Sequence, residues 1–570
     1  MSGPQNAGRA ARMVRPHRPA VAVWGLALWL TVAGNLPLWQ RLHELTVGSS
    51  RQPLLFAGIG LLVAGATAAL LSLAAWPRVF RPVASLLAVI AAVNSHFMWQ
   101  YGAVIDSTML ANVVNTDVRE VRDLMSWSLP LTVLLVAGPP LWWIWRRPLP
   151  ARAWFHHAWR NAAGALFGMA VVAASVMLGF QDLAPLVREQ KSLRYMINPL
   201  NAVYAGTRLA LDSLPAQTRS LEPVGEDARL GASYHAQARP PLLMIVVGET
   251  ARARNWGLNG YARQTTPALA RWQAEGDLVN FSNVRSCGTN THVSVPCMFS
   301  PLTREEGGDR AAVHENLLDV LHRAGLAVLW IDNQSGCKGV CARVSGVTMR
   351  DAPVPGLCDS GECLDEAMLE GLDARIAALE PERRARGVVL VMHQMGSHGP
   401  AYFKRTPPDR KPFQPECTNN MLSDCPIEHV VNAYDNTIAE TDRFLDLSLR
   451  WLQARAASGA YDTALLYMSD HGESLGEGGL YLHGLPFAIA PAEQIEVPMV
   501  AWLSPGMQAR SRASVDCLRA RSAEPLSHDN LFHSVLGLMH IETGAYRPSL
   551  DALAPCSAER PAAIALARRG

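Results

Sequence analysis

No cysteine precedes Cys287 in this chain of 570 residues, and all ten cysteines lie at or after that position. Since disulfide bonds persist in oxidising compartments, the contrast predicts that the two halves of the chain meet different surroundings. The chain also lacks a basic cluster, an internal repeat and a low-complexity tail, and its formal net charge is only +2. We therefore expect no nucleic-acid partner.

Long apolar runs fill the cysteine-free half. Each is close to the ~20 residues that cross about 30 Å of hydrocarbon. They are Val21–Trp39, Leu54–Ala75, Val83–Gln100, Leu129–Trp145 and Ala162–Phe180. We expect five transmembrane helices. The first run is longer than the hydrophobic core of a signal peptide and no clear cleavage site follows it, so we expect it to be retained.

The placement of arginine predicts the orientation of these helices. Arginines gather in the N-terminus and in the second–third and fourth–fifth connections, namely at Arg9, Arg12, Arg15, Arg18, Arg78, Arg81, Arg146, Arg147, Arg152 and Arg160. With five spans these three segments share one side, which the positive-inside rule makes cytoplasmic. Everything after Phe180 then lies outside, and the distribution of cysteine indicates the same side independently.

The connection Tyr101–Trp127 is long for a helical bundle. Its apolar residues recur at helical spacing, at Met109, Val113, Val114, Val118 and Val121. This pattern predicts an amphipathic helix at about residues 105–122 that lies on the outer membrane interface. Asn112, Thr116 and Glu120 recur every four residues and share one polar face. That face is either a solvated stripe or a binding face for a lipid headgroup.

The rest of the chain divides into a linker and a soluble domain. Residues 181–240 have a mixed composition with scattered Pro, Gly and Ser, and we expect a linker with some helix. We assign residues 1–180 to a transmembrane domain, with the interfacial helix inside it, and residues 241–570 to a soluble domain.

The soluble domain alternates short apolar runs with helical stretches. The runs Pro241–Gly248, Ala327–Ile331, Gly387–Met392 and Thr463–Met468 are typical of parallel strands buried on both faces. Helical stretches lie between or beside them at Val313–Ala324, Leu364–Leu379 and His429–Ala454. The alternation predicts an α/β domain with a mostly parallel sheet.

Reactive side chains follow every predicted strand. They are Glu249 after the first, Asn333 and Lys338 after the second, His393 and His398 after the third, and Asp470 and His471 after the fourth. Because ligands bind at the carboxyl ends of such strands, we expect these groups at one edge, with His483 from a further Gly-rich loop. Taken singly, each has an ordinary alternative: a helix cap for Glu249, a structural role for a histidine, and an exposed surface position for Lys338.

The stretch Ser286–Cys297 contains two hydroxyl nucleophile candidates, Thr289 and Thr291. With Glu249, Asp470 and His471 they form the set that a zinc-dependent transfer or hydrolytic site needs: carboxylate oxygens, an imidazole, and a hydroxyl whose proton the metal helps to remove. The combination predicts a phosphoryl-transfer metal site.

The cysteines lie close together in pairs, which suggests local disulfide bonds around these loops. The pairs would be Cys287 with Cys297, Cys337 with Cys341, Cys358 with Cys363, Cys417 with Cys425 and, over a longer separation, Cys517 with Cys556. Connectivity cannot be deduced from sequence, so this is a hypothesis. The alternative is zinc binding by the thiolates of Cys337 and Cys341.

Several motifs carry a resemblance to a known family. They are Val247-Gly-Glu-Thr-Ala-Arg252, Ser286-Cys-Gly-Thr-Asn-Thr291, Gly336-Cys-Lys-Gly-Val-Cys341, Gly396-Ser-His-Gly-Pro400 and Ser469-Asp-His-Gly-Glu-Ser474. Together with Tyr101–Glu120, they resemble the inner-membrane phosphoethanolamine transferases that modify lipid A, which include the mobile colistin-resistance enzymes. The resemblance implies an alkaline phosphatase/sulfatase-like fold for the soluble domain.

The same resemblance implies a role for each candidate residue. Thr291 would be the nucleophile, and Glu249, Thr291, Asp470 and His471 would hold the catalytic Zn²⁺. Lys338, His393, His398 and His483 would contact a substrate phosphate, and the histidines leave room for a second zinc. Asn112, Thr116 and Glu120 would receive the ethanolamine headgroup. His292 departs from the family pattern, in which a small or apolar residue often follows the nucleophile.

The reaction implied is transfer of phosphoethanolamine from phosphatidylethanolamine to a phosphate of lipid A, through a covalent adduct on the threonine. We expect a monomer in the bacterial inner membrane, with several spans and a periplasmic catalytic domain, that gives resistance to polymyxin and other cationic peptides. Two alternatives remain: a related metal-dependent transferase or sulfatase-like hydrolase with another acceptor, and a non-enzymatic membrane sensor that has kept the fold.

Overall fold

The computed structural model describes residues 18–47, 50–114, 118–190, 192–213, 221–236, 238–307, 314–359 and 362–557. Contacts divide the chain into two compact units. The first unit comprises Met1–Ser107 and Met125–Leu209, and the second comprises Thr108–Leu124 and Ala210–Gly570. The segment 108–124 therefore groups with the soluble part of the chain, whereas the sequence pattern had placed it with the membrane helices.

The first unit is helical. Three of its helices are long and apolar enough to cross a membrane: α3 (Gln52–Leu73), α4 (Phe80–Tyr101) and the Trp154–Met177 part of α9 (Trp154–Glu189). Two bent pairs pass the same test together, α1 (Pro19–Ala33) with α2 (Leu36–Thr46) and α7 (Ser128–Val136) with α8 (Gly138–Arg146). If each bent pair is one span, the spans number five, as predicted. The short α10 (Ser192–Tyr195) and α11 (Leu200–Ser213) follow.

The bends have a local cause. The pairs bend by 55° and 40°, and in each the second helix carries proline in its first turn, at Pro37 in α2 and at Pro139 and Pro140 in α8. Proline is tolerated in the first turn of a helix, but it cannot continue the hydrogen bonding of a preceding one. The two apolar runs that looked continuous in the sequence are therefore each a pair of helices with a bend between them.

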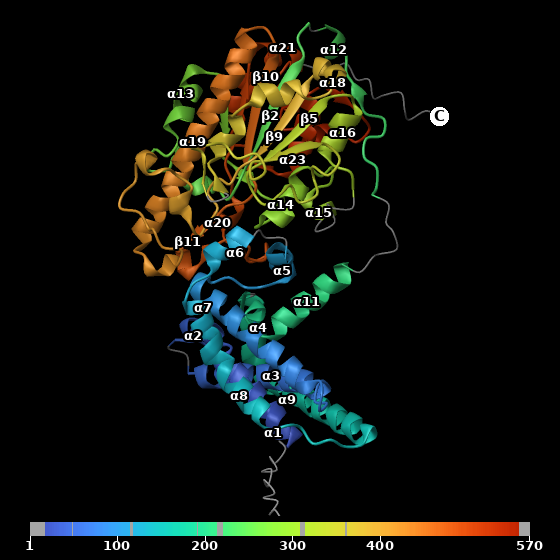
Figure 1. Cartoon of the computed structure of the whole chain (residues 1–570), viewed down its shortest axis with the longest axis vertical. Helices are drawn as coiled ribbons and strands as arrows, with labels where there is room; N and C mark the ends of the chain where they lie inside the picture. Colours follow the sequence, from blue (N-terminus) through green and yellow to red (C-terminus); the bar gives the residue numbers. More distant parts are fainter. Residues whose placement is uncertain are drawn as a thin grey trace, which may run out of the picture. The chain divides into compact units, whose positions relative to one another are not determined.

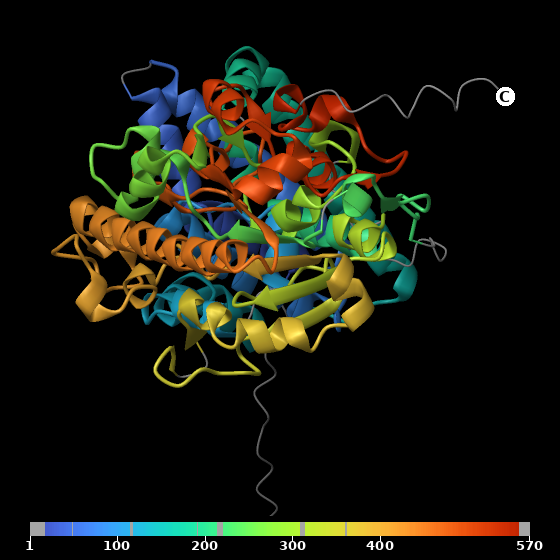
Figure 2. The ribbon, with the colours of Figure 1, turned by 90° about the horizontal axis from the view of Figure 1, so that it is seen from above.

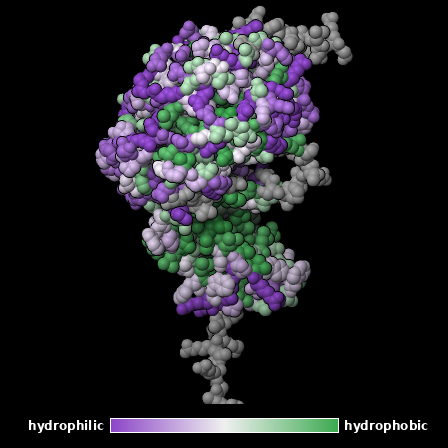
Figure 3. All heavy atoms as spheres, turned by 45° about the horizontal axis from the view of Figure 1, so that its top comes forward, coloured by the Kyte–Doolittle hydropathy of each residue, from purple (hydrophilic) through white to green (hydrophobic). Residues whose placement is uncertain are grey.

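Small residues let α3 and α9 pack closely. A Cβ atom on Gly65 would lie 2.8 Å from the carbonyl oxygen of Gly168, and a Cβ on Gly168 would lie 2.6 Å from that of Gly65. Such close backbone approach is typical of helix pairs in membranes. Hydrophobic side chains gather over the surface of this unit (Figure 3), as expected for a surface that meets lipid.

The second unit is built on a seven-stranded sheet. In spatial order the strands are β3 (Leu278–Phe281), β13 (Met499–Leu503), β10 (Asp462–Ser469), β2 (Pro241–Gly248), β9 (Val388–His393), β5 (Ala327–Asp332) and β6 (Ser345–Thr348). The four predicted strands are the parallel centre (Figure 1). The strands β3, β6 and β13 were not predicted, and β13 runs antiparallel to both its neighbours, so the sheet is mixed.

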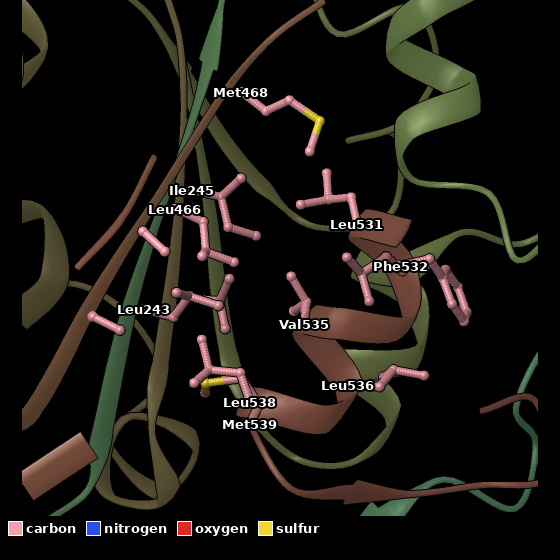
Figure 4. Packing of buried hydrophobic residues seen from close by; sticks show 14 of the residues in the cluster. Leu243, Ile245, Leu466, Met468, Leu531, Phe532, Val535, Leu536, Leu538 and Met539 are labelled. Atoms are coloured by element: carbon pink, nitrogen blue, oxygen red, sulfur yellow. The ribbon is translucent and has the colours of Figure 1, made fainter. Parts of the chain in front are cut away.

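Alternating side chains divide the core between the two faces of the sheet. Leu243, Ile245 and Val247 of β2 belong to one apolar cluster, and Leu242 and Met244 belong to the other. The first cluster packs against α23 (Asp529–Leu538), as Figure 4 shows for Leu243 and Ile245. The second packs against the long helix α19 (Ile427–Ala457), which runs along the sheet in Figure 2. A sheet buried on both faces is the reason for the continuous apolar runs in the sequence.

Shorter elements complete the second unit. They include α5 (Ser107–Val114), α6 (Val118–Leu124), α13 (Pro267–Glu275), α14 (Thr291–Met298), α16 (Leu317–Arg323), α17 (Leu372–Ala377), α18 (Pro381–Arg386), α21 (Pro505–Ser511) and α22 (Val515–Ala520). The predicted helix at 364–379 is a 3-10 turn (Asp365–Leu369) followed by α17.

Five disulfide bonds lie in the second unit, and they join the cysteines that the spacing paired. Cys337 is bonded to Cys341, so neither offers a thiolate and the alternative of a zinc site at these two residues is wrong. The other bonds join Cys287 to Cys297, Cys358 to Cys363, Cys417 to Cys425 and Cys517 to Cys556.

Candidate active site

The carboxyl ends of the central strands bring the predicted reactive residues to one edge. Gly248 of β2 is level with Ser469 of β10, so Glu249 and Asp470 leave the sheet side by side. His393 ends β9 and is level with Asp332, the last residue of β5. This edge is where an open α/β sheet binds its ligands.

Glu249, Asp470 and His471 form a compact and fully buried group. Their ligand atoms all lie within 4.8 Å of one another. His471 Nε2 lies 3.4 Å from Glu249 Oε1 and 3.3 Å from Asp470 Oδ2. Carboxylates and imidazoles are common zinc ligands, and two carboxylates and an imidazole crowded together and buried could hold a metal ion.

The hydrogen bonds around this group leave its inward atoms free. His471 Nδ1 lies 2.9 Å from the carbonyl oxygen of Gly472, which only accepts, so Nδ1 donates this bond and Nε2 is the nitrogen that remains for an ion. Asp470 Oδ1 accepts from the backbone N–H of Thr250 at 3.1 Å and of His471 at 2.7 Å. Asp470 Oδ2 and His471 Nε2 have no hydrogen-bond partner among the described residues. Both atoms fit as ligands of one ion.

The protonation of the cluster is strongly perturbed when no ion is bound. Burial and the charge of Glu249 raise the pKa of Asp470 to about 7. Burial works against the His471 imidazolium, but the charge of Asp470 and the contact with Glu249 outweigh it and raise the pKa of His471 to about 10. Burial likewise opposes ionisation of Glu249, yet the nearby His471 lowers its pKa below the usual range. Protons therefore occupy the cluster where a cation would otherwise sit.

Thr291 lies directly beside the cluster. It is the first residue of α14, whose N-terminus is capped by the Asn290 side chain accepting from Val293 N–H at 3.1 Å. The Thr291 hydroxyl lies 3.3 and 3.4 Å from the two carboxylate oxygens of Glu249. Thr289 points elsewhere and donates to the carbonyl of Leu485 at 2.7 Å. The geometry therefore separates the two nucleophile candidates in favour of Thr291.

The three predicted histidines flank this centre. His393 Nε2 lies 3.8 Å from Glu249 Oε2, and its Nδ1 lies 3.2 Å from Asp332. Burial works against the His393 imidazolium, but the contact with Asp332 outweighs it and raises the pKa of His393. The His483 ring lies 4.3 Å from that of His471 and 5.5 Å from that of His398. The structure thus brings His393, His398 and His483 together with the cluster.

Lys338 lies in the loop after β5, in a backbone conformation with φ of 50°. Its Nζ donates to the hydroxyl of Ser335 at 2.8 Å and to the Ser335 carbonyl at 3.2 Å. Asn333 donates to Asp365 at 2.8 Å and to the carbonyl of Cys363 at 2.9 Å. Asn333 thus has a structural hydrogen-bonding role in this loop.

The predicted headgroup face is described only in part. Asn112 lies on α5 and is half-buried, Thr116 lies outside the described residues, and the side chain of Glu120 is not described. α5 does reach the candidate site, because a Cβ atom on Gly484 would lie 2.8 Å from the sulfur of Met109. Gly484 follows His483, so α5 packs beside one of the three histidines.

Glu473 orients the centre and was not predicted from the sequence. It is buried, accepts from the Tyr402 hydroxyl, and lies 2.8 Å from His483 Nδ1. Burial raises the pKa of Glu473 to about 8. Its position two residues after His471 in Asp470-His-Gly-Glu473 was the available signal.

His528 was missed as well. Its Nδ1 accepts from Cys287 N–H at 3.2 Å, and its Nε2 donates to the carbonyl of Ser469 at 2.9 Å. Burial lowers the pKa of His528 to about 4, so the ring is neutral and joins the nucleophile loop to the strand that carries Asp470. No motif in the sequence marks this residue, because its partners are backbone groups distant along the chain.

Two family profiles match the chain, one in the apolar first part and one in the second part, which contains the cysteines. The sulfatase profile matches residues 241–541, and the profile of phosphoethanolamine transferase EptA/EptB matches residues 63–214. The first match covers the sheet and every member of the Glu249 cluster. It agrees with the sulfatase-like fold that the motifs implied for the soluble domain.

Full-length relatives match both parts together. The phosphoethanolamine transferase EptA of Escherichia coli K12 is 37% identical over 93% of this chain and 95% of its own length. The phosphatidylethanolamine transferase Mcr-1 of Escherichia coli is 36% identical over 86% of this chain and 90% of its own. The integral membrane protein lipooligosaccharide phosphoethanolamine transferase A of Neisseria meningitidis has a TM-score of 0.88 at 34% identity, covering 95% of this chain and 99% of that structure. This chain therefore belongs to the phosphoethanolamine transferase family, and it is a membrane-bound transferase.

Proposed function

We propose that this chain transfers phosphoethanolamine from phosphatidylethanolamine to a phosphate of lipid A, with Thr291 as the nucleophile and Glu249, Thr291, Asp470 and His471 as the ligands of Zn²⁺. One observation carries the proposal: the Thr291 hydroxyl lies 3.3 Å from Glu249 within the buried carboxylate and imidazole cluster. Membership of the phosphoethanolamine transferase family supports phosphoethanolamine as the transferred group. The hydroxyl, carboxylate and imidazole groups of the site support a zinc-dependent phosphoryl transfer.

In the first step the Thr291 oxygen bonds to the phosphorus of the donor. The bond from phosphorus to the diacylglycerol oxygen breaks, and diacylglycerol leaves with the proton that Thr291 has lost. Zinc, when bound, supplies a Lewis acid that lowers the pKa of a hydroxyl and offsets the charge on the phosphoryl oxygens. Glu249 orients the hydroxyl, and the N-terminus of α14 provides backbone N–H groups that favour an anion.

In the second step a lipid A phosphate oxygen attacks the same phosphorus. The bond between phosphorus and Thr291 breaks, Thr291 regains a proton, and the product carries a new ammonium group. We assign His393, His398 and His483 to the binding of substrate phosphates or of a second zinc, and Lys338 to the same role as a point charge. The added ammonium weakens attraction between the outer membrane and cationic peptides such as polymyxin.

The membrane part supports the same proposal. Both substrates are lipids, so a catalytic domain at the bilayer surface meets them without extraction. We assign the helices of residues 1–180, apart from the segment 108–124, to the inner membrane, residues 181–240 to a linker and residues 241–570 to a periplasmic zinc-dependent domain, acting as a monomer. The arginines at the N-terminus and the disulfide bonds of the second unit both support this orientation.

Mass spectrometry of the intact protein tests the proposal. The purified full chain, loaded with zinc in nanodiscs that contain phosphatidylethanolamine, should gain one phosphoethanolamine, and fragmentation should place it on Thr291. Addition of lipid A should discharge the adduct. A folded, zinc-loaded protein that gains no adduct, or gains it on Thr289, would contradict the assignment.

A further inference from the structure

Asp123 joins the segment 108–124 to the body of the second unit. Asp123 lies on α6, is only 4% exposed, and forms ion pairs with Lys404 and with Arg405, the latter at 3.5 Å. Its backbone carbonyl also accepts from the side chain of Asn420 at 2.8 Å. One residue of α6 therefore makes three contacts, all with the 404–420 region.

One partner of Asp123, Arg405, is fixed against the loop of His398. Arg405 is 8% exposed, donates to the carbonyl of His398 at 3.0 Å, and forms a second ion pair with Glu362 at 3.0 Å. Lys404, in contrast, is 38% exposed in its side chain. Removal of the Asp123 charge would leave Arg405 with Glu362 alone and would end the ion pair with Lys404, so we expect α6 to be held less tightly.

The segment also touches the other side of the candidate site. The sulfur of Met109 on α5 fills the space above Gly484, which follows His483. The same segment therefore contacts the site at two places, through α5 near His483 and through α6 on the arginine that holds the loop of His398. The chain enters this segment from α4 and leaves it to α7, both in the first unit.

We infer that Asp123 is a positioning residue for the lipid donor: its ion pairs with Lys404 and Arg405 hold α5 and α6 on the catalytic unit, so that α5, which carries Asn112 and the predicted headgroup face, stays against the loop of His483 and Gly484. This inference rests on the proposed function, because it assigns that face to the donor headgroup. Asp123 touches neither the donor nor the metal. It serves the first half of the reaction, in which the headgroup must reach Thr291, and not the second.

The test separates the two half-reactions in the full chain, loaded with zinc in nanodiscs. The rate of adduct formation from phosphatidylethanolamine is followed by intact mass, and the discharge of a preformed adduct to lipid A is followed separately. Asp123→Asn should slow adduct formation at low donor content by about tenfold, which is about 1.4 kcal/mol, mainly through the apparent KM. Discharge should stay within about twofold of wild type.

Four further variants test this interpretation. Lys404→Met removes a partner at a half-exposed position and should slow the same step, and the double variant Asp123→Asn/Lys404→Met should be no slower than Asp123→Asn alone. Asp123→Glu should recover part of the rate. Asp516→Asn removes an acid from an exposed ion pair with Arg519 and should change neither step.

A second measurement is independent of turnover. Hydrogen exchange in residues 107–114 and 118–124 should become faster in Asp123→Asn and stay unchanged in Asp516→Asn. Unchanged adduct formation in both Asp123→Asn and Lys404→Met, equal slowing of both half-reactions, or unchanged exchange would each overturn the inference. If wild type forms no adduct, the proposed function falls, and the exchange result alone decides whether Asp123 holds the segment.

Discussion

The two units place polar and apolar side chains in opposite ways. In the first unit, Trp99, Trp142 and Phe167 are each 60% exposed. In the second unit, Glu249, Asp470 and His471 are at most 1% exposed. An exposed ring is favourable where the solvent is hydrocarbon, whereas a buried charge is costly without a partner that compensates it. The difference indicates that the first unit is organised for its surroundings, and the second around one polar centre.

Both units also use glycine for close approach, with different results. Gly65 and Gly168 let two helices pack, whereas Gly396, with φ of 50°, lets a loop pack on the backbone of Glu249. A side chain at Gly168 would disturb the packing of two helices in the first unit. A side chain at Gly396 would displace a candidate zinc ligand. Substitutions in the first unit should therefore change mainly stability, and substitutions at the site in the second unit should change mainly activity.

The largest expected effect belongs to the nucleophile. Thr291→Ala should lower transfer by about a thousandfold or more, because it removes the hydroxyl, 3.3 Å from Glu249, that we propose as the attacking group. Zinc content and melting temperature should not change. Thr289→Ala removes only the hydrogen bond to Leu485 and is the matched control. Transfer at the wild-type rate by Thr291→Ala would refute the role of this residue.

The next largest expected effect is the change of zinc affinity with pH. Without an ion, Asp470 has a pKa of about 7 and His471 of about 10, so zinc must displace one proton between these values and two below pH 7. Affinity should therefore fall as pH falls, by about tenfold per pH unit for each proton displaced. Competition with a chelator at pH 6 and pH 8 measures the slope.

Asp470→Asn keeps the shape of the site but removes one ligand charge, and it should lose most of the zinc. Chelation should stop transfer in the wild type, and added zinc should restore it. An affinity that does not depend on pH would mean that these side chains do not hold the metal. Zinc retained in full by Asp470→Asn would mean the same.

A smaller effect is expected at Gly396. A Cβ atom there would lie 2.6 Å from the carbonyl oxygen and 3.2 Å from Cβ of Glu249, so Gly396→Ala should shift this ligand and lower zinc affinity by about tenfold. Gly371 has a φ of 64° and nothing within 4 Å of its position for a Cβ. Gly371→Ala therefore carries the backbone strain alone, costs about 1 kcal/mol of stability, and should leave zinc binding intact. Equal zinc affinities in Gly396→Ala and Gly371→Ala would show that the contact with Glu249 does not lower zinc affinity.

The smallest expected effect is in the first unit. Gly168→Ala places a Cβ 2.6 Å from the carbonyl of Gly65 and should destabilise the packing of α3 on α9 by about 1–3 kcal/mol, without changing zinc affinity. Gly60→Ala is the control, because its Cβ would meet only Trp39, at 3.6 Å. Unfolding in mixed micelles, followed beside zinc binding, measures both quantities. A loss of zinc binding in Gly168→Ala would contradict the expectation that a substitution in the first unit changes stability and not zinc binding.

The residues that could be predicted share a local signal. The four central strands are recognisable as continuous apolar runs because they are buried on both faces, and their reactive residues follow directly. The strands β3, β6 and β13 were missed. β3 and β6 have only four residues each and β6 is partly exposed, so their patterns are weak, whereas β13 is a fully buried apolar run with the same local signal as the predicted strands. His528 and Asp123 were missed because their partners lie far along the chain, at Cys287 and Ser469 for the first and at Lys404 and Arg405 for the second.

The disulfide bonds include both kinds of case: most have a local signal in the sequence, and one joins cysteines that are remote in sequence. The bonds of Cys417 with Cys425 and of Cys358 with Cys363 close short loops, and closeness in sequence was enough to suggest them. Cys517 and Cys556 are 39 residues apart, and their pairing was suggested only because every other cysteine had a nearer partner. The structure supplies the reason, because α22 and the turn that contains Cys556 pack together, with Ser514 N–H donating to the Cys556 carbonyl.

The amino-acid sequence by itself determined the apolar spans, the parallel strands at the centre of the sheet and the set of groups that meet at their ends, because periodicity and strand direction are local properties. Only the tertiary structure decided which threonine faces Glu249, how the hydrogen bond to Gly472 orients His471, and that residues 108–124 pack with the catalytic unit. These outcomes depend on distances between segments that are remote in sequence, and such distances are set by packing and by the pairing of buried charges.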